Sequence, residues 1–196
     1  MAEHLEIEQK FDVDPGFERP SLEGLAGTHA ADPVLHRLSA TYFDTADEVL
    51  AANKITLRRR TGGPDEGWHL KLPAEAGARR EVHAPLDGPV EEVPEVLRDR
   101  IAEVTGGLPL APIAQLNTER TVVTLTSADG QVAAEVADDL VTARRLPNGD
   151  TVTWREVEVE VPVADPELQR AAAEALFAAG ARPAGHGSKL ARVLAG

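Results

Sequence analysis

Charged side chains alternate with apolar ones in several short stretches of this 196-residue sequence. In the opening MAEHLEIEQKF, the residues Glu6, Glu8 and Lys10 occupy every second position, and the glutamates of REVEVE (155–160) do the same. Side chains two positions apart share one face of a strand, so each stretch would place carboxylates roughly 7 Å apart on one surface. Hard divalent cations prefer oxygen ligands, and the pattern therefore predicts a metal site.

Basic residues are concentrated in a different part of the sequence. The window 54–83 holds seven Lys or Arg residues against four acids, so it carries a charge of +3 inside a chain of −13. Arg58 and Arg60 alternate in ITLRRR, and His69 and Lys71 alternate in WHLKL. Because the planar guanidinium donates two parallel hydrogen bonds, arginine is well suited to phosphate.

The two groups together describe a metal-assisted polyphosphate site. Exposure to solvent would explain any one of the alternating stretches. It explains the set less well, because arginine is gathered on contiguous stretches and glutamate on the first and the late ones. We therefore favour a shared charged interior over a series of solvated faces.

Composition excludes several other classes of function. The net charge of −13 argues against general binding of nucleic acid or anionic membranes. The chain has no cysteine, so any metal must be held by oxygen or imidazole ligands. No apolar run reaches the roughly 18 residues of a membrane span, and the acidic N-terminus does not resemble a signal peptide. We expect a cytoplasmic protein with one domain over residues 1–196.

Period-2 apolar patterns predict that strands predominate. They occur in LEIEQKF, SATYFDT, ITLRRR, WHLKLP, REVHAPL, TERTVVTLTS, QVAAEVADD and TVTWREVEVEV. Turn residues in TGGPDEG, SADG and PNGD separate several of these patterns, which predicts antiparallel hairpins. A charged face that recurs on so many strands must line a solvent-filled interior, and this favours a closed or nearly closed barrel.

Helical signals are fewer than strand signals. VPEVLRDRIAEVTG has apolar residues at helical spacing and a stop at Gly106, and DPELQRAAAEALFAAG offers Asp165 as N-cap and Gly180 as C-cap. A short helix in GSKLARVLA is expected at the end. Region 14–40 is the least readable, with short helices around 21–26 and 33–38 as candidates. The fold class is therefore α+β.

The ordered motifs resemble those of the CYTH superfamily, the triphosphate tunnel metalloenzymes. The opening Glu6-x-Glu8-x-Lys10 resembles the ExExK signature of that family, and the similarity continues through YFDT, LRRR, WHLKLP, the acidic VADD, REVEVE and GSKLAR. ExExK alone is a weak motif, whereas the ordered series along the whole chain is strong. The resemblance implies an eight-stranded antiparallel closed β-barrel with flanking helices, whose tunnel binds a linear triphosphate with metal.

The resemblance also implies roles for individual residues. Asp139 is the alternative to Asp138 if the strand register is off by one, and Glu160 ranks below Glu156 and Glu158. Thr118 stands where many relatives carry a second basic residue. The implied catalytic residues are Glu6, Glu8 and Lys10; the implied metal ligands are Glu6, Glu8, Asp138, Glu156 and Glu158; and the implied phosphate-binding residues are Lys10, Arg58, Arg60, Lys71, Arg79, Arg120 and Lys189.

The activity implied by this resemblance is hydrolysis of a triphosphate with Mg²⁺ or Mn²⁺. Inorganic tripolyphosphate is the first substrate to consider, because no pair of aromatic residues is placed to stack a thiamine or adenine ring. The alternatives are a thiamine triphosphatase, a class IV adenylate cyclase, and a module that binds polyphosphate without cleaving it. The expected partner is a small-molecule triphosphate or inorganic polyphosphate, with no nucleic acid and no membrane; a homodimer is left open.

Overall fold

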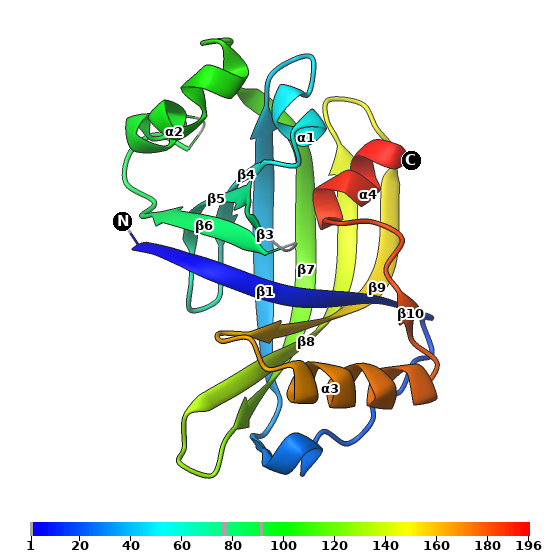
Figure 1. Cartoon of the computed structure of the whole chain (residues 1–196). Helices are drawn as coiled ribbons and strands as arrows, with labels where there is room; N and C mark the ends of the chain where they lie inside the picture. Colours follow the sequence, from blue (N-terminus) through cyan, green and yellow to red (C-terminus); the bar gives the residue numbers. More distant parts are fainter. Residues whose placement is uncertain (1, 76–77, 91) are drawn as a thin grey trace.

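A computed structural model describes residues 2–75, 78–90 and 92–196, with side chains from Ile7 onward. Its main feature is one strongly curved antiparallel sheet that wraps around an interior (Figure 1). The strands are β1 (Ala2–Val13), β2 (His29–Ala30), β3 (Val34–Asp44), β4 (Thr56–Thr61), β5 (Gly67–Pro73), β6 (Arg79–Ala84), β7 (Ala111–Thr126), β8 (Val132–Arg145), β9 (Thr151–Val161) and β10 (Arg182–Pro183).

Helices are short and peripheral to this sheet. Asp165 caps α3 by accepting from the Leu168 amide at 2.9 Å, and Gly106 ends α2 in the left-handed region at φ 60°, as the sequence predicts. The helices are α1 (Val49–Ala52), α2 (Glu95–Thr105), α3 (Pro166–Ala178) and α4 (Lys189–Ala195), with a 3₁₀ helix at Leu25–Gly27. None of those formed by the described residues has the length and apolar character that crossing a membrane requires.

The antiparallel α+β class is confirmed, but the strand count is wrong, because the described residues form ten strands and not eight. Nine of them follow the order β10-β1-β6-β5-β4-β3-β7-β8-β9, and β2 pairs with β7 off this path. The prediction of a closed barrel is also corrected. β1 pairs with β6 along Ala2–Glu6 and with β9 along Ile7–Val13, and no described residue of β1 pairs with both strands. One bent strand thus spans the two ends of the curved sheet, and the hydrogen-bonded wall is discontinuous at this seam.

The hairpins form where turn residues predict them, since TGGPDEG joins β4 to β5, SADG joins β7 to β8 and PNGD joins β8 to β9. The helix expected around 33–38 is wrong, because this segment begins β3 and pairs with β7 from Val34 onward. Its Pro and His content hid a strand whose partner residues on β7 lie about 70 to 90 positions away. The helix expected around 21–26 is reduced to the 3₁₀ turn at Leu25–Gly27.

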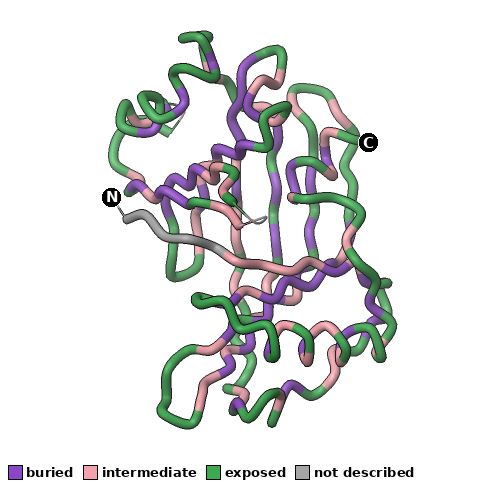
Figure 2. Tube along the Cα trace, in the orientation of Figure 1, coloured by how far each residue is buried: buried purple, intermediate pink, exposed green. Residues whose placement is uncertain are grey.

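Three apolar clusters hold the layers together. α3 packs Leu168 and Leu176 on the outer face of β7, β8 and β9, and α2 packs Leu97 and Ile101 on the outer face of β4, β5 and β6 together with Trp68. Each such buried side chain contributes about 1.5–3 kcal/mol. Figure 2 shows buried residues along these strands and exposed ones at the hairpin tips. The outward face of the sheet is thereby apolar beneath α2 and α3, and the alternate side chains on those strands, many of them charged, face the interior.

Helix α4 closes one end of that interior. Its Leu190 and Val193 pack inside the curved sheet against Tyr42, Trp154 and neighbouring small residues of β7 and β8. Ser188 caps the helix by accepting from the Ala191 amide at 3.0 Å. The residue that follows the cap, Lys189, is thereby directed into the interior.

Candidate active site

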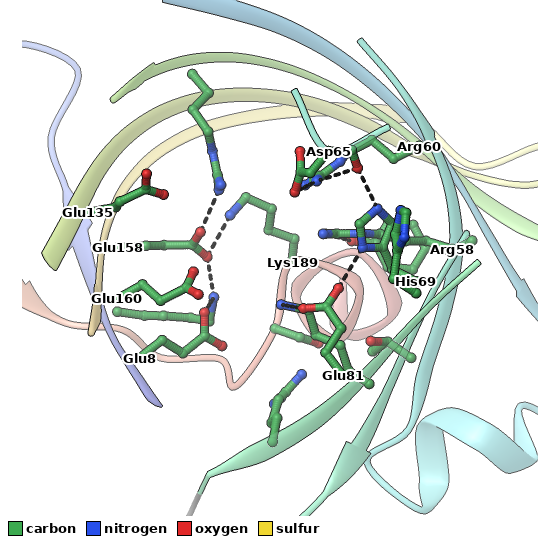
Figure 3. A pocket seen from close by; sticks show the side chains of 18 residues that line it. Glu8, Arg58, Arg60, Asp65, His69, Glu81, Glu135, Glu158, Glu160 and Lys189 are labelled. Atoms are coloured by element: carbon green, nitrogen blue, oxygen red, sulfur yellow. Dashed lines mark hydrogen bonds and ion pairs between the residues drawn. The ribbon is translucent and has the colours of Figure 1, made fainter. Parts of the chain in front are cut away.

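The interior contains a cavity of about 280 Å³ (Figure 3). Its walls come from β1 and β3–β9 with the start of α4, and most of its lining side chains are charged. Among the residues that the sequence predicts for the site, those that line this cavity are Glu8, Lys10, Arg58, Arg60, Lys71, Arg79, Arg120, Glu158 and Lys189. Residues from almost the whole length of the chain therefore meet in one place.

Charge is divided between two sides of the cavity. The side formed by β4 and β5 presents Arg58 and Arg60, while the side formed by β1, β8 and β9 presents Glu8, Glu158 and other glutamates (Figure 3). Because successive strand residues point to opposite faces, two alternating patterns on different strands are enough to produce this division. A linear polyanion and a divalent cation could be held side by side between them.

A buried acidic cluster lies at the end covered by α4. Carboxylate oxygens of Asp139, Glu156 and Glu158 lie within 4.8 Å of one another, and all three residues are buried. The Lys189 ammonium lies among them, 2.8 Å from Asp139 and 2.7 Å from each glutamate. Burial lowers the pKa of Lys189, but these three carboxylates outweigh that effect and raise it, so the lysine is charged.

Arg120 and Lys10 complete the pairing of this cluster. Arg120 donates two hydrogen bonds to Asp139, at 2.8 and 2.6 Å, and a third to Glu158 at 2.5 Å. Lys10 bonds Glu158 and, at 2.9 Å, Glu8. Burial lowers the pKa of Lys10, yet Glu158 and Glu8 raise it overall. Lys10 is therefore a hydrogen-bond donor at neutral pH, and the pKa of its ammonium gives no support to a role as a base.

The structure places Asp139, and not Asp138, with the other carboxylates. Asp138 faces away from the cavity and forms a two-pronged ion pair with Arg155, at 2.8 and 2.7 Å. The prediction of Asp138 as a metal ligand therefore placed the wrong aspartate on the inner face of β8. Asp139, the alternative, is the one that lies inside. The sequence VADD leaves the phase ambiguous, because either aspartate fits an alternating pattern.

A row of three glutamates lies along one wall of the cavity. Glu8, Glu160 and Glu135 occupy opposite positions on β1, β9 and β8, and all three line the cavity. Like charges directly opposite one another are destabilising, so such a row favours a bound cation. Sequence reasoning ranked Glu160 low and missed Glu135. Glu135 lies four positions before Asp139, which puts both on one face of β8. This spacing is the sequence signal that could have identified Glu135.

Arg58 and Arg60 retain unused hydrogen-bonding capacity. Arg58 donates to the Tyr42 hydroxyl at 3.4 Å, and the Nε atoms of both arginines are buried without a hydrogen-bond partner among the described residues. Burial and the neighbouring Arg58 lower the pKa of Arg60 to about 10, which leaves it charged at neutral pH. Buried guanidinium donors without acceptors are suited to an incoming anion.

Other predicted positions are distributed as follows. Glu6 pairs with Arg79 in the register of β1 and β6, but its side chain lies outside the described part of the structure. Thr118 is buried inside the sheet without lining the cavity. Trp154 donates to Glu156 at 2.5 Å and is covered by the Arg192 guanidinium at 4.9 Å. Arg192 therefore covers the face of the Trp154 ring on which a ligand would stack.

The interior also contains a histidine that sequence reasoning left without a role. His69 Nδ1 lies 2.5 Å from Glu81 Oε1, and His69 Nε2 lies 3.0 Å from the Asp65 carbonyl oxygen. Burial lowers the pKa of His69 to about 4, and repulsion from Arg58 and Arg60 acts in the same direction. The interaction with Glu81 raises this pKa but does not offset the shift. The imidazole is therefore neutral at physiological pH.

We expect the His69 imidazole to protonate only near pH 4 in an NMR titration, with its signals assigned through His69→Gln. The folded-state pKa lies below the ordinary value of 6.5, so the unfolded chain binds more protons between these values. This group's contribution to the free energy of unfolding should decrease, on the order of 2–3 kcal/mol, as pH falls from 6.5 to 4. A titration midpoint near 6.5 would contradict the assignment.

Comparison with known families identifies this architecture. The family model described as CYTH domain matches residues 4–193. The chain belongs to the CYTH family. The uncharacterized proteins MT2285 and Rv2226 of Mycobacterium tuberculosis are each 44% identical over 208 residues, covering 98% of this CYTH chain and 40% of the relative. The chain therefore spans 40% of the length of these relatives.

Solved structures share the CYTH fold at lower identity. A candidate adenylate cyclase from Bacillus halodurans has a TM-score of 0.66 and 21% identity, with 98% of each chain covered. A candidate adenylyl cyclase from Hippeastrum, described as having a dominant triphosphatase activity, has a TM-score of 0.61 and 19% identity, with 97% of this chain and 95% of that one covered. Identities this low show the fold of the CYTH chain and not its substrate.

Proposed function

We propose that this CYTH chain uses a divalent metal to hydrolyse a linear triphosphate, with inorganic tripolyphosphate as substrate and pyrophosphate and phosphate as products. The observation that carries the proposal is the division of charge in the cavity, with arginines on β4 facing glutamates on β1, β8 and β9. Phosphoryl transfer needs positioning and charge neutralisation far more than covalent help from the protein, and this cavity offers both.

The cationic residues of the cavity bind the phosphates. Arg58 and Arg60 have buried donors to spare, and Lys71 and Arg79 extend the cationic side toward β6. Arg120, Lys10 and Lys189 face the acidic side and are already held by carboxylates, so they would exchange part of that pairing for phosphate oxygens. Their raised pKa values keep all three charged throughout.

The residues also fit a divalent cation. All donors on the acidic side are carboxylates, which suits Mg²⁺ or Mn²⁺. The Lys189 ammonium already occupies the centre of the cluster of Asp139, Glu156 and Glu158. Glu8, which pairs with Lys10, lies directly opposite Glu160 across β1 and β9, so two carboxylates face the cavity side by side. We therefore assign the metal to Glu8 and Glu160, with Glu135 beside them. A cation held by these carboxylates would supply charge neutralisation for the phosphate oxygens and a more acidic water.

Inorganic triphosphate is favoured over a nucleotide or thiamine ester by the lining of the cavity. Among its described lining residues, Tyr42 is the single Phe, Tyr or Trp, and its hydroxyl is engaged by Arg58. Both tryptophans lie elsewhere, Trp68 beneath α2 and Trp154 under Arg192. Apart from Tyr42, the described lining residues offer no Phe, Tyr or Trp ring on which a base or a thiamine ring would stack.

The test is a ³¹P NMR time course with Mg²⁺ or Mn²⁺, offering tripolyphosphate, thiamine triphosphate and ATP in parallel. Conversion of tripolyphosphate to pyrophosphate and phosphate, faster than turnover of the other two, is the expected result. Pyrophosphate with cyclic AMP from ATP would instead indicate a cyclase. Line broadening without turnover of any compound would indicate a binding module, which is the outcome that the carboxylate row argues against.

A further inference from the structure

Asp65, in the hairpin between β4 and β5, lies against the guanidinium of Arg60 (Figure 3). The Arg60 side chain is 5% exposed and that of Asp65 is 61% exposed, so the carboxylate stands between the guanidinium and solvent. The Asp65 carbonyl oxygen accepts from Arg60 Nη2 at 3.2 Å and lies 3.0 Å from His69 Nε2. One loop residue therefore holds Arg60 through both its backbone and its side chain.

This contact occupies part of the proposed phosphate-binding surface. Arg58 and Arg60 alternate along β4 and both line the cavity, but in the described residues only Arg60 has a carboxylate ion pair. Partial burial raises the pKa of Asp65, while attraction to Arg60 lowers it overall, so the group is an anion at neutral pH. At the Arg60 end of the cavity a carboxylate already fills the position of an incoming anion.

We propose that Asp65 is a carboxylate stop, which occupies the anion subsite at Arg60 and limits how many phosphate groups of a linear polyphosphate the cavity accepts. The inference rests on the proposed function and narrows its substrate class to short linear polyphosphates. A longer chain would bring a further phosphate to the Nη2 side of Arg60, where it would meet a like charge and have to displace it. A short chain ends at Arg58 and the unpaired Nε–H of Arg60, before the side that Asp65 occupies, and is unaffected.

The test measures binding in EDTA, so that no turnover interferes. Tripolyphosphate and tetrapolyphosphate are titrated by calorimetry into the wild type and into Asp65→Asn, which keeps the shape of the side chain and removes its charge. The preference for tetrapolyphosphate, taken as the ratio of the two Kd values, should rise about ten-fold in Asp65→Asn. Asp65→Ser serves as a second variant, and thermal melting checks that each variant is folded.

Glu66→Gln is the matched control. It removes the same charge from the adjacent residue, whose carboxylate accepts from the Gly62 amide at 3.4 Å and does not line the cavity. The Kd ratio should keep its wild-type value in this variant. In an Arg60→Gln background, Asp65→Asn should no longer change the ratio, because the effect passes through Arg60.

Two outcomes would overturn the stop, and they are distinguishable from failure of the proposed function. An unchanged Kd ratio in both Asp65 variants, or an equal change in Glu66→Gln, would remove Asp65 from the determinants of chain length while hydrolysis of tripolyphosphate stands. Failure of the wild type to bind or cleave tripolyphosphate under any metal condition would overturn the proposed function, and the stop with it.

Discussion

Glu8→Gln is expected to lower kcat for tripolyphosphate by about 100-fold or more at saturating Mg²⁺ or Mn²⁺. The Glu8 side chain is 11% exposed, lines the cavity and stands opposite Glu160, which makes it central to the assigned metal site. The amide has nearly the same shape but offers a weaker ligand without charge. Phosphate binding depends on the cationic residues, so the affinity for tripolyphosphate in EDTA should be kept or slightly increased.

Glu119→Gln is the control for this substitution. Glu119 lies on β7 next to Arg120, but it points outward, is exposed and pairs with Arg37 at 3.3 Å. Its change removes the same charge and should leave both kcat and Mn²⁺ affinity unchanged. Titration of Mn²⁺ followed by electron paramagnetic resonance should show weaker binding in Glu8→Gln alone. Wild-type turnover by Glu8→Gln at saturating metal would contradict the assignment.

Lys189→Met is expected to lower the free energy of unfolding at pH 7 by about 3–5 kcal/mol. The substitution keeps the apolar stem and removes the ammonium that lies 2.7–2.8 Å from three buried carboxylates. Arg120 and Lys10 remain, but they cannot balance Asp139, Glu156 and Glu158 together. Repulsion among unpaired buried charges is the physical reason for the loss, and denaturant unfolding followed by circular dichroism measures it.

The pH dependence of this loss provides an independent check. In the wild type, cations outweigh burial and lower the pKa of Asp139 and Glu158, so their stabilisation is present above the unfolded pKa near 4 and is lost as pH falls further. Without Lys189 these pKa values rise, and protonation relieves the repulsion. The difference in stability between wild type and variant should therefore shrink from pH 7 to pH 5.

Arg170→Met is the matched control for the loss of a cation. Arg170 and Glu174 form an i,i+4 pair on α3 in which both side chains are 63% exposed. Solvent screens exposed pairs of this kind, so the loss in Arg170→Met should be small and should show little change between pH 7 and pH 5. A loss in Lys189→Met no larger than in Arg170→Met would show that the acidic cluster does not depend on its lysine.

Alternating and turn-forming residues in the sequence were sufficient to predict the strands, the hairpins and the division of the strands into an apolar and a charged face. Period-2 patterns report directly which side chains share a face, and turn residues report where neighbouring strands reverse. For that reason the alternating pattern alone could assign Glu8, Lys10, Arg58 and Lys71 to one interior. The Gly106 end of α2 and the Asp165 cap of α3 were predictable on the same grounds, whereas the C-cap of α3 is Ala179, one residue before the predicted Gly180.

Only the tertiary structure decided which strands surround the interior, which aspartate of VADD lies inside, and which cation each carboxylate meets. The pairing of β1 with both β6 and β9 joins residues about 80 and 150 positions apart, and no local pattern encodes such a register. Asp138 and Asp139 differ by one residue, so a single step in phase exchanges the cavity for the outer surface. The sequence by itself thus determined the kinds of charge that line the site, whereas long-range strand pairing determined their partners.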